Sequence, residues 1–120
     1  MEHDPPRCDA ALSKAFDVLG KRWTGVVIGT LIKGPAGFAE VARALGGISQ
    51  SVLSDRLAEL TRVGLVQRTV HEGPPVAVRY ALTETGEALV PALDALAGWA
   101  AKHLRDAPAG SAVESAAPVG

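Results

Sequence analysis

The sequence predicts a mainly α-helical fold that carries one small β-hairpin (α+β). Three observations predict it. Apolar residues recur at helical spacing in five segments, and two short stretches rich in β-branched residues flank a Gly/Pro turn near residue 73. A chain of 120 residues with 48% hydrophobic content can also bury one core without disulfides or metal. We place this domain at residues 8–105, after a flexible N-terminal arm (1–7) and before a disordered tail (106–120) that holds almost no large apolar residue.

The first two helices are predicted at residues 9–19 and from about 22 to 32. Gly20 separates them, and Gly34-Pro35 ends the second. The second segment is apolar nearly all round, so we expect a buried central helix. Gly25 and Gly29 stand four residues apart, which suggests that a neighbouring helix packs closely against it.

The next two helices are predicted at residues 38–45 and 50–63, separated by a break at Gly46-Gly47. Ser49 is a good N-cap for the longer helix, and Gly64 suits the position just after its end. Leu53, Leu57 and Leu60 share one face of that helix, so we expect its opposite, polar face to be exposed.

Two strands, at about residues 65–71 and 76–82, should form a hairpin, and Thr83 should cap a last helix that runs towards residue 104. Two short helices joined by a glycine turn and followed by a hairpin are typical of a winged helix-turn-helix. The last helix carries an apolar stripe that includes Trp99. The stripe either pairs with its copy in a second subunit, giving a two-fold homodimer through the terminal helices, or covers the chain's own core.

In a helix-turn-helix, the second helix enters the major groove and its N-terminal residues meet base edges. The corresponding polar residues here can read bases or bind phosphate. They are Ser49, Gln50, Ser51, Ser54, Asp55, Arg56 and Arg62. An amphipathic helix with a merely solvated polar face is the alternative interpretation.

Charge placement favours double-stranded DNA as the partner. The chain has a net charge of −1, but residues 20–80 hold eight Lys and Arg against four acidic residues. A basic centre between acidic ends provides local attraction to phosphate, although chance clustering is the alternative. Lys21 and Arg22 at the start of the central helix are candidate phosphate anchors, and His71 and Arg79 flank the hairpin tip.

Other functional classes find little support. The three histidines are scattered, and no metal-ligand spacing, phosphate loop or nucleophile elbow occurs, so we expect neither an enzyme nor a cofactor. The start of the chain lacks the apolar stretch of a signal peptide, and no apolar run is long enough to cross a membrane. We therefore expect a cytoplasmic protein with no membrane partner.

The single cysteine, Cys8, stands just before the first predicted helix. A helix N-terminus and the neighbouring Arg7 favour a thiolate, whereas Asp9 raises the thiol pKa. A sensor of oxidants or electrophiles and a silent cysteine are both consistent with this placement.

From about Cys8 to His103, the sequence resembles the HxlR family of bacterial regulators. The matching stretches run in family order. They are LGKRWT at 19–24, GPAGFAE at 34–40, GISQSVLSDRLAEL at 47–60, GLVQR at 64–68 and YALTETG at 80–86. The resemblance implies a homodimer built from the first and last helices, with operator binding by residues 49–63 and by the wing. It also implies that Cys8 is the counterpart of a cysteine through which some members sense quinones, aldehydes or hypochlorite.

We therefore predict a dimeric transcriptional regulator that binds a palindromic operator and responds to a small molecule or to a redox signal. Two alternatives remain open. A winged-helix protein-interaction module would show no salt-dependent DNA binding. A carrier of a small ligand would need a roomy apolar pocket.

Overall fold

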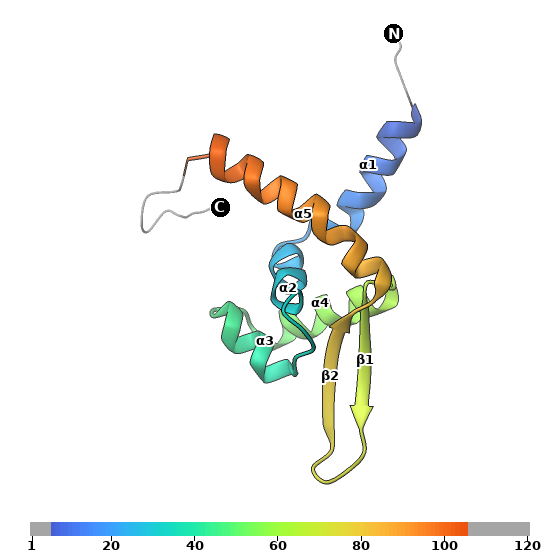
Figure 1. Cartoon of the computed structure of the whole chain (residues 1–120), viewed down its shortest axis with the longest axis vertical. Helices are drawn as coiled ribbons and strands as arrows, with labels where there is room; N and C mark the ends of the chain where they lie inside the picture. The colour runs from blue at the N-terminus through green and yellow to red at the C-terminus, as the bar shows by residue number, and fades with distance from the viewer. Residues whose placement is uncertain (1–5, 106–120) are drawn as a thin grey trace. The chain divides into compact units, whose positions relative to one another are not determined.

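The computed structural model describes residues 6–105, with side chains described from residue 10 onward. Residues 1–5 of the predicted arm and the predicted tail at 106–120 lie outside this range. The chain divides between Val90 and Pro91 into two compact units, which are described separately. The elements, in order, are α1 (Pro6–Leu19), α2 (Thr24–Leu31), α3 (Phe38–Leu45), α4 (Gln50–Arg62), β1 (Val66–His71), β2 (Ala77–Leu82) and α5 (Glu84–His103) (Figure 1).

The first helix begins three residues earlier than the apolar pattern predicts. Because α1 starts at Pro6, Cys8 lies within its first turn and not ahead of it. The second helix begins later than predicted, at Thr24, because Trp23 adopts a left-handed backbone conformation with φ of 80°.

One face of helix α2 forms the centre of the core. Val27, Ile28 and Leu31 are buried, as expected of a central helix, whereas Val26 is 52% exposed, so the helix is covered along one face. The close helix packing predicted at Gly25 and Gly29 is not found among the residues that the structure describes. A Cβ added at either glycine of this described segment would meet nothing within 4 Å.

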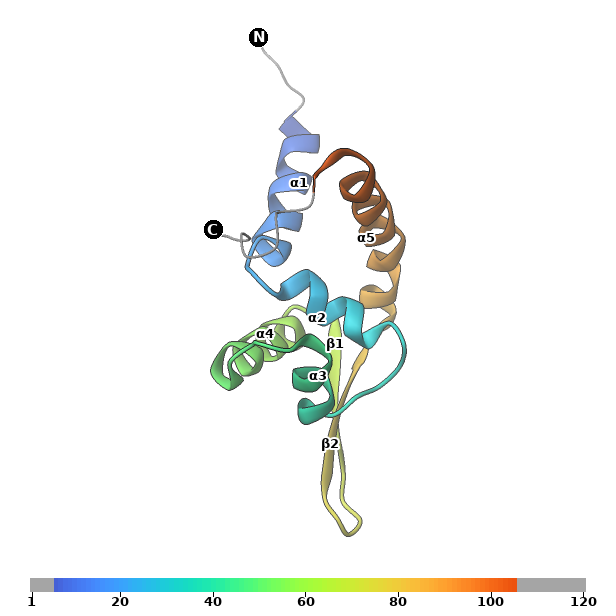
Figure 2. The ribbon, with the colours of Figure 1, turned by 90° about the vertical axis from the view of Figure 1, so that its left-hand side faces the viewer.

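Helices α3 and α4 pack against the buried side of α2, where Figure 2 shows them together. Val41 of α3 is buried with Leu53, Leu57 and Leu60 of α4. The hydroxyl of Ser49 accepts a hydrogen bond from the backbone N–H of Val52 (3.1 Å), as an N-cap should. The predicted helix-turn-helix core is therefore confirmed.

A glycine turn ends α4 and leads directly into the hairpin. The Leu65 N–H donates to the Leu60 carbonyl (2.9 Å) and the Gly64 N–H donates to the Thr61 carbonyl (3.1 Å). This pair of bonds is a Schellman motif, and it needs a left-handed residue, which Gly64 supplies with φ of +88°. The turn thus fixes the direction in which β1 leaves the recognition-type helix.

The hairpin is antiparallel, with a register that runs from Val66 opposite Leu82 to His71 opposite Ala77. Ala36, in the loop between α2 and α3, pairs with Tyr80 through two backbone hydrogen bonds of 2.9 and 2.8 Å. The base of the hairpin is therefore joined to the helix-turn-helix, while its far end projects from it (Figure 1).

The start of α5 is held tightly against the end of α4. The Thr83 hydroxyl accepts from the Gly86 N–H (3.1 Å), which confirms the predicted cap, and it donates to the Gly64 carbonyl (2.6 Å). Gly86 is buried, and a Cβ added there would overlap the backbone oxygen of Leu65. Only glycine therefore fits at this crossing of α5 over the chain.

The second unit comprises the part of α5 after Val90. Three of its large apolar side chains are about half exposed: Leu96 is 48%, Trp99 is 52% and Leu104 is 54% exposed. The Trp99 and His103 rings lie 6.3 Å apart between centroids.

Candidate nucleic-acid interface

The polar face of α4 is open, as predicted from its leucine spacing. Ser49, Gln50, Ser51, Ser54 and Asp55 are all exposed, whereas the three leucines on the opposite face are at most 1% exposed. These five residues occupy the first half of the helix and its cap. They therefore present amide, hydroxyl and carboxylate groups to the surroundings at the end that meets base edges in a helix-turn-helix.

Three of the predicted cations converge on one carboxylate of α4. Glu59 accepts a hydrogen bond from the ammonium group of Lys21 (3.1 Å). The guanidinium groups of Arg56 and Arg62 lie 3.4 and 3.9 Å from its oxygens. The Lys21 hydrogen bond and the three positive charges hold the pKa of Glu59 below its usual value, against the opposite effect of burial. We refer to Glu59, Lys21, Arg56 and Arg62 as the Glu59 cluster.

Members of the Glu59 cluster differ in access to solvent. The side chains of Lys21 and Arg62 are 53% and 70% exposed, whereas Arg56 is 13% exposed. The buried Nε of Arg56 has no hydrogen-bond partner among the described residues. This placement favours a role in which Arg56 holds Glu59 in position, in place of the base contact that its position in the helix suggested to us.

Lys21 and Arg22 lie in the turn before α2, two to three residues from its first turn. The guanidinium of Arg22 lies over the indole ring of Trp23, 5.6 Å from its centroid, a geometry that allows a cation–π interaction. Both cations are exposed.

Arg79 anchors the middle of the hairpin, where it stands opposite Thr69. One nitrogen of its guanidinium donates to the Pro35 carbonyl (2.9 Å), and the other lies 3.7 Å from the carboxylate of Glu40. Glu40 also accepts from the Gly37 N–H (2.7 Å) at the start of α3. Arg79 therefore ties the hairpin to α3, with 41% of its side chain exposed. His71, at the far end of β1, is exposed.

A cavity of about 520 Å³ lies in the angle between α4 and the hairpin. Its lining is formed by Ser54, Ala58, Thr61, Arg62, Arg68 and Tyr80. Arg68 was missing from our predicted site. Strand alternation could have indicated it, because Arg68 shares a face of β1 with Val66, which is buried, while β1 packs on α4. Arg68 is thus a further cation beside the exposed face of α4.

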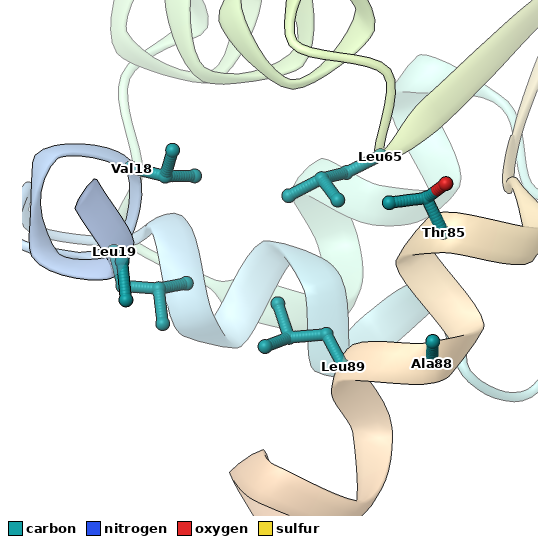
Figure 3. A pocket seen from close by; sticks show the side chains of 7 residues that line it. Val18, Leu19, Leu65, Thr85, Ala88 and Leu89 are labelled. Carbon is teal, nitrogen blue, oxygen red and sulfur yellow. The ribbon is translucent and has the colours of Figure 1, made fainter. Parts of the chain in front are cut away.

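A second, apolar pocket of about 310 Å³ opens between α1, Leu65 in the turn before β1, and the first turns of α5. Figure 3 shows Val18 and Leu19 of α1 on one side and Leu89 of α5 on another. The complete lining is Ala15, Val18, Leu19, Leu65, Thr85, Ala88 and Leu89. The sequence did not indicate this pocket, because its walls come from three distant segments.

Residues that could hold a metal ion do not gather in the described part of the chain: no group of three or more His, Cys, Asp or Glu side chains is found there. Among the described helices, none is long and apolar enough to cross a membrane.

Comparison with known proteins identifies the family. The model of the HxlR-like helix-turn-helix family matches residues 18–108. The chain belongs to the HxlR-like helix-turn-helix family. The resemblance drawn from the sequence motifs is thereby confirmed, and the chain is a helix-turn-helix transcriptional regulator by descent.

Individual HxlR-like relatives cover most of the chain. The uncharacterised regulator YvaP of Bacillus subtilis (strain 168) is 42% identical over 91 residues, which are 76% of this chain and 84% of YvaP. The transcriptional regulator YodB of the same strain is 42% identical over 89 residues, 74% of this chain and 80% of YodB. The structure of reduced YodB matches with a TM-score of 0.74 at 37% identity, and covers 86% of this chain and 97% of that one.

A redox regulator, HypR, has the same fold. Its oxidised form matches with a TM-score of 0.74 at 33% identity, and covers 80% of this chain and 98% of that one. The predicted winged helix-turn-helix is therefore confirmed by both the element order and the structural neighbours.

Proposed function

We propose that this HxlR-like regulator binds a palindromic operator as a homodimer, with α4 in the major groove and the hairpin as a wing along the adjacent backbone. The exposed polar face of α4 is the observation that carries the proposal. Gln50, Ser51, Ser54 and Asp55 point away from a face that is closed by buried leucines. A helix with one polar, exposed face and one buried face can lie in a groove while its leucines stay packed in the core.

The cations around α4 supply the attraction to the DNA backbone. Lys21, Arg62 and Arg68 stand on α4 or on the elements beside it, and none is deeply buried. The cavity lined by Arg62, Arg68 and Tyr80 has room for a sugar-phosphate unit, and its hydroxyl and guanidinium groups are suitable donors to phosphate oxygens.

Replacing Gln50 by alanine tests this assignment. A glutamine that makes a bidentate contact to adenine contributes about 1–3 kcal/mol of discrimination, so Gln50→Ala should weaken operator binding about 5- to 150-fold. Ser13→Ala, which changes an exposed residue of α1, is the control and should leave binding unchanged. Equal affinities of the two variants in a gel-shift titration would remove Gln50 from the interface.

Two exposed apolar faces support the dimer. On α1, Leu12 and Phe16 are 56% and 52% exposed, and in the second unit Trp99 is 52% exposed. Apolar side chains of this size usually lie against a partner. Phe16→Glu and Trp99→Glu should each shift the protein towards monomer in sedimentation velocity, while Lys14→Glu on the same helix as Phe16 should not. A wild-type protein that sediments as a monomer at all concentrations would contradict the dimer.

We further propose that an oxidant or electrophile acts on the regulator through Cys8. Cys8 is in the first turn of α1, and solved structures of the related YodB are described as diamide-treated and quinone-bound. A modification at this turn would act on the helix that we place in the dimer. Diamide should release the wild-type protein from DNA and leave Cys8→Ser bound. Release of Cys8→Ser would show that the signal enters elsewhere.

The apolar pocket in Figure 3 is our candidate site for a small-molecule effector. Its volume of about 310 Å³ suits a small aromatic molecule, and its walls include Leu65 at the joint between α4 and the wing. The probe is 8-anilinonaphthalene-1-sulfonate, whose fluorescence should rise with the wild-type protein. Ala88→Leu fills the pocket and should reduce the rise, whereas Ala58→Leu on α4 should not. An unchanged signal in Ala88→Leu would place the probe elsewhere.

The alternative is a winged-helix protein-interaction module that does not bind DNA. It predicts no salt-dependent binding to any duplex. The gathering of exposed cations beside α4 favours the regulator, because an interaction module has no need of them.

A further inference from the structure

We propose that Glu59 determines specificity by acting as an internal substitute for a DNA phosphate. In the free protein its carboxylate forms ion pairs with Lys21 and Arg62. Only a correctly docked operator then brings its phosphates close enough to replace the carboxylate as the partner of these cations. The inference rests on the proposed DNA binding of α4 and adds a role for a residue that makes no base contact.

The geometry of the Glu59 cluster carries the proposal. The side chain of Glu59 is 13% exposed and lies on the flank of α4, between its buried and exposed faces. One of its oxygens accepts from Lys21, which comes from the turn before α2, 38 positions away. The other oxygen lies 3.9 Å from Arg62, on the same helix. A single carboxylate thus joins two elements and two exposed cations.

Arg56 explains why the carboxylate is held in place. Its guanidinium lies 3.4 Å from the same oxygen that Lys21 binds, and only 13% of its side chain is exposed. A nearly buried arginine needs a counter-charge, so Arg56 and Glu59 form the fixed part of the cluster. Lys21 and Arg62 are the adjustable part, because more than half of each side chain is in solvent.

The consequence concerns random DNA. The affinity of a protein for non-specific duplex comes almost entirely from cations that neutralise phosphates. While Glu59 engages Lys21 and Arg62, the two cations release fewer counterions from a duplex that does not fit α4. An operator that fits brings its phosphates close enough to compete for them. Glu59 therefore lowers non-specific binding more than operator binding.

The test is Glu59→Gln, which keeps the shape and removes the charge. Affinity for a random duplex should rise at least threefold, and the slope of log affinity against log salt should steepen by about one to two units per protomer, because one or two cations are freed. The ratio of operator to random affinity should fall. Circular dichroism and thermal melting establish that the variant is folded.

Asp55→Asn is the matched control. It removes the same charge from the exposed face of the same helix, but no described cation is paired with Asp55. Its removal should change the affinity without steepening the salt slope. The proposal is overturned if Glu59→Gln binds random duplex no better than the wild type, or if the two variants change the slope equally.

A second measurement decides the question if Glu59→Gln does not fold. Lys21→Gln and Arg62→Gln are exposed substitutions that keep Glu59 paired with Arg56. Each should change the slope on random duplex by clearly less than one unit, because Glu59 already engages these cations. A change of a full unit in the slope of log affinity against log salt, for either variant, would overturn the proposal. A wild-type protein without salt-dependent binding to any duplex would instead reject the proposed function itself.

Discussion

Replacing Gly86 by alanine sets two opposed effects against each other at the start of α5. Alanine is the better helix former by about 1 kcal/mol in an exposed helix interior. At Gly86, however, the new Cβ would overlap the backbone oxygen of Leu65 and lie 3.2 Å from its carbonyl carbon. It would also come within 3.3 Å of a Leu82 methyl group.

The steric effect should dominate, because the backbone that would have to move is held in place. The Leu65 carbonyl accepts from the Thr83 N–H (3.0 Å), and the Leu65 N–H belongs to the turn that ends α4. Overpacking of a well-packed site costs about 1–3 kcal/mol, and at a rigid backbone contact the upper end applies. After the gain in helix propensity, we expect a net loss of about 2 kcal/mol.

Thermal unfolding measures this loss. For a domain of this size, about 2 kcal/mol corresponds to a fall in Tm of roughly 8–16 °C, compared at one protein concentration because a dimer's Tm depends on it. Gly98→Ala is the matched control on the same helix. A Cβ at Gly98 meets nothing within 4 Å, so only the propensity gain remains and Tm should rise by a few degrees. A Gly86→Ala protein as stable as Gly98→Ala would refute the close approach of α5 to Leu65.

Three further outcomes are expected. Gly64→Ala should destabilise the protein by about 1–2 kcal/mol in urea unfolding, because the residue has φ of +88°, a left-handed conformation in which an alanine Cβ is strained. An unchanged midpoint would contradict the turn. Arg68→Ala should lower affinity for all duplexes alike and reduce the salt slope by about one unit per protomer, whereas Lys33→Ala should not; equal slopes would remove Arg68 from the interface. The wild type should be more stable than Glu59→Gln near neutral pH, because the folded-state pKa of Glu59 is lowered and its ionised form stabilises the fold. This difference in the free energy of unfolding should shrink as the pH falls from about 5 to 3. Urea titrations that give a constant difference across that range would contradict the Glu59 cluster.

Local signals predicted the elements and their ends well. Ser49 and Thr83 bind the first backbone N–H groups of their helices, and Gly64 adopts the left-handed conformation, because each effect depends only on neighbours in the chain. Apolar spacing likewise predicted which face of α4 is open. The same spacing could not show that Val26 is exposed, because a helix that is apolar all round carries no information about which side the rest of the chain covers.

The site was predicted less completely, since its contacts join distant segments. Spacing within α4 could have paired Arg56 with Glu59 at three residues' separation, but nothing local brings Lys21 to the same carboxylate. Arg79 was expected beside the wing tip and instead binds the Pro35 carbonyl, 44 positions away. The position of a cation along the chain therefore predicts which helix or strand carries it. The carboxylate or carbonyl that binds it is determined by tertiary packing.

DNA reading by α4 is tested most directly by equilibrium binding of the purified, reduced protein to its own upstream intergenic DNA. Fluorescence anisotropy would be followed across a salt series, with random duplex of the same length as competitor. The upstream duplex should bind more tightly than the random one at every salt concentration, and log affinity should fall linearly with log salt. Equal affinity for the two duplexes, or an affinity independent of salt, would contradict DNA reading by α4 and favour the interaction module.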